Sequence, residues 1–198
     1  MQQSHCLVVN VLMTFRETLL CLVTLGWASS PASYAQAGPD QTVARFLETV
    51  KAYVAQRDKL EKTVPSLPNE ATPEQIDGHQ RALAALIQSA RSTARPGDLF
   101  GTAMTTHLRK RLRQIFSGSD GPAMRAQILE EYPGPTTLTI NGRYPEQVPL
   151  SNIPPPVFAV FPELPDAVEF RFIGTQLILF DSRANLVIDF IRNALPAR

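Results

Sequence analysis

Three side chains near the carboxyl end of the sequence, Glu169, Arg171 and Asp181, have the residue types that acid–base chemistry uses. They lie in two short runs that alternate between apolar and polar residues, separated by Gly174-Thr175. Such a pattern predicts a β-hairpin over 168–181. Residues two apart on a strand point to the same face, so Glu169 and Arg171 are expected to share a face.

The register of this hairpin decides what the two carboxylates can do. A strict two-residue turn pairs Glu169 with Phe180 and puts Asp181 on the opposite face, whereas one bulged residue brings Asp181 beside Glu169. The bulged form would make a carboxylate pair for general acid–base work, with Arg171 holding an anionic substrate group. The alternative, which we favour, is a set of ion pairs on the solvent face, each worth roughly a few tenths of a kcal/mol.

Asp189 lies inside the apolar run 186–191. A carboxylate there must either point outward by strand alternation or be buried with partners, and burial would raise its pKa. A buried carboxylate with a shifted pKa is a functional-site candidate. Alternation is the simpler arrangement, so we expect Asp189 to point outward.

One run of basic residues, His107 to Arg113, falls on a predicted helix. Helical spacing spreads Arg109, Lys110 and Arg113 over the outer arc of that helix. Such a face could contact an anionic envelope component, such as lipid or peptidoglycan. The ordinary interpretation is a solvated face whose charges pair with acids elsewhere, such as Glu130 and Glu131.

A proline-rich segment, 145–165, precedes the hairpin and carries Phe158 and Phe161 among other apolar residues. Long irregular segments inside a domain are often functional, and exposed apolar surface on this one would form a partner-docking site. The favoured alternative is an extended strap packed across the sheet, with its prolines lowering the entropy of the unfolded chain.

Common catalytic motifs are missing from the sequence. It has no G-x-S-x-G, P-loop or G-x-G-x-x-G motif. Neither His79 nor His107 has a second ligand at the i+4 spacing of a helical zinc site. We therefore expect no metal and no cofactor. With 19 Lys and Arg against 18 Asp and Glu, the chain also lacks the basic character of nucleic-acid-binding domains, so no nucleic-acid partner is expected.

The first 37 residues have the features of an export signal. A short charged stretch after Met13, itself a possible true start, is followed by the apolar run 19–27 and by Ala35-Gln36-Ala37. The run is too short to cross a bilayer as a helix. Cleavage before Gly38 would leave a mature chain with no cysteine and no transmembrane span; an uncleaved N-terminal anchor is the alternative.

Residues 38–198 are expected to form a single α+β domain. Apolar spacing near 3.6 residues predicts helices over about 41–62, 73–95, 101–116 and 122–131. From about 133 the sequence becomes proline-rich and alternating, with Asn141-Gly142 as a hairpin signal and strands expected at 168–173, 176–180 and 184–191. The simplest architecture is an N-terminal helical layer on a small C-terminal antiparallel β-meander.

The sequence pattern of the strands at 169–174, 179–181 and 184–191, together with the loop 95–100, resembles small exported bacterial proteins of unassigned function. The resemblance implies a bacterial exported protein and transfers no catalytic residue. The sequence thus predicts an exported, periplasmic or extracellular, non-enzymatic protein that binds a partner or an envelope component. The alternative is a small hydrolase or lyase that uses Glu169 and Asp181.

Overall fold

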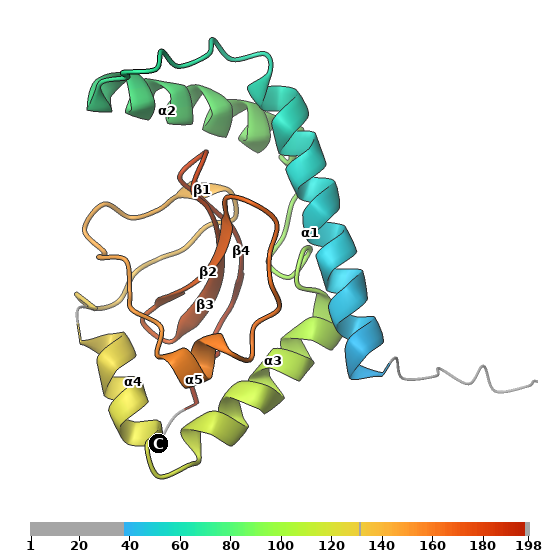
Figure 1. Cartoon of the computed structure of the whole chain (residues 1–198), viewed down its shortest axis with the longest axis vertical. Coiled ribbons are helices and arrows are strands. Elements are labelled where there is room, and N and C mark those ends of the chain that lie inside the picture. The colour runs from blue at the N-terminus through green and yellow to red at the C-terminus, as the bar shows by residue number, and fades with distance from the viewer. Residues whose placement is uncertain (1–37, 131, 197–198) are drawn as a thin grey trace, which may run out of the picture. The chain divides into compact units, whose positions relative to one another are not determined.

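Helices dominate the first part of the chain because apolar residues recur there at helical spacing. The computed structural model describes residues 38–130 and 132–196, and the predicted signal peptide, including Met13, lies outside these residues. The helices are α1 (Pro39–Glu61), α2 (Pro73–Ala90), α3 (Gly101–Phe116), α4 (Gly121–Leu129) and the single turn α5 (Pro155–Phe158) (Figure 1).

Local capping explains where α2 begins. The Thr72 hydroxyl accepts from the Gln75 N–H at 3.3 Å, and the Gln75 side chain accepts from the Thr72 N–H at 2.8 Å. This reciprocal pair is a capping box, formed by two residues only three positions apart in the sequence. Helix α1 begins at Pro39, two residues before the predicted start at about 41, with Gly38 as its N-cap.

Four antiparallel strands form one sheet in the order β1-β4-β3-β2. They are β1 (Gly142–Arg143), β2 (Val168–Ile173), β3 (Gln176–Asp181) and β4 (Leu186–Ile191). The predicted α+β class, with helices first and an antiparallel sheet after them, is confirmed (Figure 1).

The β2–β3 hairpin has the strict two-residue turn. Ile173 pairs with Gln176 across Gly174-Thr175, and Val168 pairs with Asp181. Gly174 has a φ of 56°, a left-handed conformation that glycine adopts without strain. The bulge in this sheet lies instead between β3 and β4, where Ile188 is the extra residue between two paired positions.

Side chains from both faces of the sheet are buried. One face packs against α1, α2 and α3, and its core includes Phe46, Leu83, Leu108, Phe170 and Leu179. The other face carries a smaller cluster of Tyr144, Val148, Ile173, Ile178, Phe180, Val187 and Phe190, with Leu138 and Ile140 packed against it. The irregular chain after α4 therefore covers the face that the helices leave open.

The predicted hairpin at Asn141-Gly142 is wrong. Asn141 has a φ of 56°, and the Gly142 N–H donates to the Thr139 carbonyl, so the chain does turn there. The partner of β1 is β4, however, with Gly142 opposite Val187. The chain before the turn, 136–140, is not a strand. It packs Leu138 and Ile140 on the smaller cluster instead.

Candidate functional site

The structure does not bring Glu169 and Asp181 together. The register puts Asp181 opposite Val168, and its side chain faces the helices, whereas Glu169 lies on the other face. Glu169 forms an ion pair with Arg171, whose Nε lies 2.8 Å from the Glu169 carboxylate. The bulged arrangement needed for acid–base catalysis was therefore wrong, and Glu169 with Arg171 forms a half-buried ion pair.

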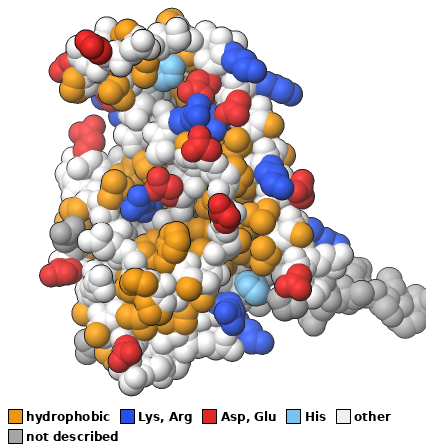
Figure 2. Space-filling model, in the orientation of Figure 1, with side chains coloured by type: hydrophobic (Ala, Val, Ile, Leu, Met, Phe, Trp, Pro, Cys, Tyr) orange, Lys and Arg blue, Asp and Glu red, His pale blue; other side chains and the backbone are white. Residues whose placement is uncertain are grey.

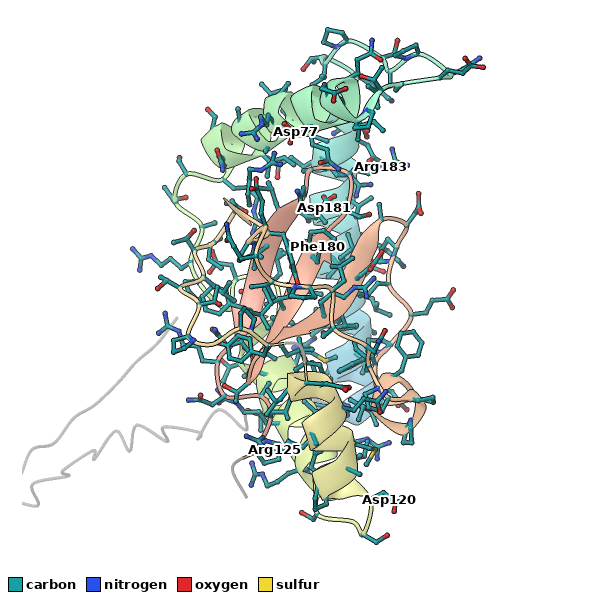
Figure 3. The ribbon with its side chains drawn as sticks, turned by 90° about the vertical axis from the view of Figure 1, so that its left-hand side faces the viewer. Asp77, Asp120, Arg125, Phe180, Asp181 and Arg183 are labelled. Carbon is teal, nitrogen blue, oxygen red and sulfur yellow. The ribbon has the colours of Figure 1, made fainter. Side chains whose placement is uncertain are left out.

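Asp181 is fully buried and tied to α1. The Tyr53 hydroxyl donates to its Oδ2 at 2.6 Å, and the Arg57 guanidinium lies 3.4 Å from the same oxygen. The backbone N–H groups of Arg183 and Ala184 donate to Oδ1. Figure 3 labels Asp181 and Arg183 at one end of the sheet. Because Tyr53 and Arg57 lie on α1, Asp181 joins the helical layer to the sheet, and the expected ion pair on the solvent face was wrong for this residue.

Burial has a marked electrostatic effect on this cluster. The pKa of Tyr53 is raised far above its usual value, first by burial and then by the adjacent Asp181 carboxylate. Arg57 on α1 is a charged residue, yet it is only 1% exposed. Its charge is matched by Asp181 and by Asp58, whose carboxylate lies 2.8 Å away. A buried charge survives only with such partners.

Asp189 is also buried, so the expected outward orientation was wrong. The bulge at Ile188 shifts the alternation of β4 by one residue and turns Asp189 toward the helical side. There the carboxylate accepts from the backbone N–H groups of Gly97, Leu99, Phe100 and Phe190 at 2.7 to 2.9 Å. Burial raises the pKa of Asp189, and these donors oppose the rise. The group fixes the loop before α3 to the sheet.

The structure places the two predicted docking residues and the Glu169–Arg171 pair around one groove. It runs beside β2, has a volume of about 760 Å³, and is called the β2 groove below. Its main lining residues are Ile153, Phe158, Phe161, Glu163, Phe170 and Arg171. Figure 2 shows hydrophobic side chains gathered over the lower middle of this face, where Figure 1 draws α5.

Phe158 and Phe161 have different positions in this groove. Phe161 is partly buried and stacks on Phe170, with ring centroids 4.4 Å apart, so it holds the strap on the core. Phe158 is 64% exposed, the most exposed of the large apolar residues described. The proline-rich segment 145–165 is thus packed as a strap at Phe161 and exposes apolar surface at Phe158. The strap interpretation describes the first part, and the docking-surface interpretation describes the second.

A second hollow, of about 570 Å³, lies beside the end of α1 and contains Glu61, Leu67, His79 and Arg183. Its Arg183 already has partners, because it pairs with Glu61 at 2.9 Å and with Asp166 at 3.1 Å. His79 lies 3.1 Å from the Pro65 carbonyl and 3.6 Å from Glu61. In the described part of the chain, no three His, Cys, Asp or Glu side chains gather as metal ligands.

The basic face of α3 is exposed as predicted. Arg109, Lys110, Arg111 and Arg113 all lie at the surface, and α3 contains no acidic residue. Within the described residues none of the four forms a salt bridge, so the suggested pairing with Glu130 is absent. Arg109 donates to the Arg192 carbonyl at 2.9 Å.

Comparisons with protein-family models, with curated proteins and with solved structures found no match. The resemblance to exported bacterial proteins therefore stays a prediction. Among residues 38–130 and 132–196, no helix has the length and apolar character that crossing a bilayer requires.

Proposed function

We propose that this chain is an exported, non-enzymatic protein that binds a segment of a partner protein in the β2 groove. The observation that carries the proposal is the exposed Phe158 at a groove whose floor is aromatic. An apolar ring left in water beside a groove is an energetic cost that binding removes. Aromatic anchors of this kind supply much of the energy of protein interfaces.

The polar groups of the groove support binding rather than acid–base catalysis. Glu169 is paired with Arg171, and Glu163 is exposed on the strap. Asp181, the second carboxylate that the hydrolase or lyase interpretation requires, is buried against Tyr53 and Arg57 and does not lie beside Glu169. Charges at the rim of an interface act mainly on specificity and association rate.

The proposal can be tested with a displayed library of short linear peptides selected against the purified exported chain. Burial of a phenylalanine side chain is worth about 1.5–3 kcal/mol. Phe158→Ser should therefore weaken the selected peptides by about 10- to 100-fold. Leu67→Ser is the matched control, because Leu67 is also a partly exposed apolar residue but lines the second hollow.

Loss of affinity in Phe158→Ser with unchanged affinity in Leu67→Ser supports the proposal. Equal affinity of wild type and Phe158→Ser overturns it, as does a selection that enriches no binding peptide. Loss in Leu67→Ser alone would assign binding to the second hollow.

The cationic face of α3 favours a second binding function. Four exposed cations without a salt bridge to the described residues form a local positive field, and such faces are attracted to anionic lipid surfaces. We propose contact between Arg109, Lys110 and Arg113 and an anionic envelope surface. Vesicle binding that falls with added salt is the corresponding test.

A further inference from the structure

The β2 groove lies along an edge strand, because β2 pairs with β3 on one side only. In a hairpin with a two-residue turn, the residues that flank the turn exchange hydrogen bonds, and every second residue then does so. Ile173, Arg171 and Glu169 are therefore the residues of β2 that bond to β3. The Ser182 N–H donates to the Ala167 carbonyl at 2.9 Å, which continues the same alternation.

The remaining residues of β2 direct their backbone groups away from β3, toward the groove. The N–H of Phe172 donates to the Ser151 hydroxyl at 3.2 Å, and that hydroxyl donates to the Phe172 carbonyl at 2.9 Å. At the other end, the Val168 N–H donates to the Pro165 carbonyl at 3.2 Å. Thus the strap satisfies both ends of the edge with its own residues.

Phe170 lies between these two fixed points. By the same alternation its N–H and carbonyl do not bond to β3, and no other hydrogen bond to either group is found among the described residues. Backbone polar groups next to apolar side chains are normally paired. The Phe170 N–H can therefore donate one further hydrogen bond, and the Phe170 carbonyl can accept one. The strap bonds to this edge at Ser151 and again at Pro165, and between these two residues it runs through α5 and borders the groove.

Part of the opposite edge of the sheet is covered. β1 pairs with β4 at Leu186 and Val187. Further along, the Ile188 carbonyl accepts from Arg91 at 3.4 Å, and Asp189 holds the loop before α3. The open backbone position at Phe170 lies on the β2 side, in the groove that contains Phe158.

We propose that the β2 groove takes an extended segment of the partner as an added β-strand, which pairs through its backbone with the N–H and carbonyl of Phe170. The inference rests on the proposed function and specifies the form of its ligand. Strand addition at an open sheet edge uses main-chain hydrogen bonds for affinity and alternate side chains for specificity.

The two faces of the groove define the chemistry of that segment. A residue directly opposite Phe170 shares its face, where Phe161 stacks, so that residue should be apolar. The residues on either side of it face Glu169 and Arg171, so they should be polar or charged. Together with Glu163, the rim carries two carboxylates and one guanidinium, and this excess favours a segment with a Lys or Arg.

The test is amide hydrogen exchange of the isotope-labelled chain, measured by NMR with and without a peptide selected on the groove. In the free protein the Phe170 amide should exchange fast, and the amides of Glu169 and Arg171, which bond to β3, should be protected. Peptide binding should slow exchange at Phe170 by at least about tenfold, because its N–H gains an acceptor.

A second measurement uses the same peptide with single backbone N-methyl groups. Methylation at the positions that pair with Phe170 removes a donor and should weaken binding by about tenfold or more, whereas methylation one position along should have a much smaller effect. A Phe170 amide that is already protected in the free protein overturns the inference. So does binding that depends on Phe158 but is insensitive to N-methylation and leaves Phe170 unprotected, and in that case the proposed function would still stand.

Discussion

Replacement of Tyr53 by Phe tests how α1 is held to the sheet. The variant removes one hydroxyl and keeps the ring, over which the Arg91 guanidinium lies at 5.0 Å. The Asp181 Oδ2 atom loses its 2.6 Å hydrogen bond and keeps only Arg57 at 3.4 Å. A hydrogen bond to a charged group contributes about 1.5–3 kcal/mol, so Tyr53→Phe should lower the free energy of unfolding by that amount. For a chain of this size the fall in Tm is about 3–12 °C.

Tyr53→Phe should also remove a decrease in the free energy of unfolding that the wild type shows at alkaline pH. Burial and the Asp181 carboxylate raise the pKa of Tyr53 well above that of the unfolded chain, which is about 10. Below pH 10 the Tyr53 hydroxyl is protonated in both the folded and the unfolded chain. Above pH 10 it stays protonated only in the folded chain. Stability therefore falls with rising pH above about 10, by about 1.4 kcal/mol per pH unit from this group. The advantage of wild type over Tyr53→Phe should be constant below pH 9 and shrink above pH 10.

The assay is urea unfolding of both proteins followed by circular dichroism at several pH values. Tyr144→Phe is the control, because the Tyr144 hydroxyl donates to a neutral carbonyl, that of Pro149, at 3.0 Å. Its loss should cost only about 0.5–1.5 kcal/mol. If Tyr53→Phe destabilises no more than Tyr144→Phe, the Asp181 contact is not what holds α1.

Three further outcomes follow from the same contacts. Asp189→Ala leaves its backbone donors without an acceptor and should cost about 2–5 kcal/mol by denaturant unfolding; a loss below about 1 kcal/mol contradicts the role of Asp189. Phe161→Ser should destabilise by about 2–4 kcal/mol because its ring packs on the core, whereas Phe158→Ser should stay within about 0.5 kcal/mol; equal Tm values would refute this difference. The double variant Lys110→Glu and Arg113→Glu should abolish sedimentation with phosphatidylglycerol vesicles, and unchanged sedimentation would remove α3 from membrane contact.

Much of the fold could be predicted because it depends on local signals. The Thr72 capping box, the apolar stripe of α3 and the two-residue turn of the β2–β3 hairpin all lie within a few residues of sequence. The prediction of a hairpin at Asn141-Gly142 failed because it rested on a local turn signal. The pairing of β1 with β4 depends on residues more than forty positions away in the sequence.

The candidate site was predictable only in part. Phe158 and Phe161 were found from their apolar character, and Glu169 and Arg171 from strand alternation, but nothing in the sequence places the two pairs around one groove. The orientation of Asp189 depends on one bulged residue, Ile188, and a one-residue shift reverses which face a side chain takes. Arg57 was missed because its burial depends on Asp181, far away in the sequence.

The most direct test of the binding site is chemical-shift mapping of the isotope-labelled chain on titration with a selected peptide. Saturable shifts should concentrate on the amides of 151–153, 158, 159, 161, 163, 164 and 168–171, which line the β2 groove. The Phe158→Ser variant should require about 10- to 100-fold more peptide for the same shifts. Shifts centred on α3 or beside Leu67, with the groove unaffected, would contradict the assignment of this groove as the binding site.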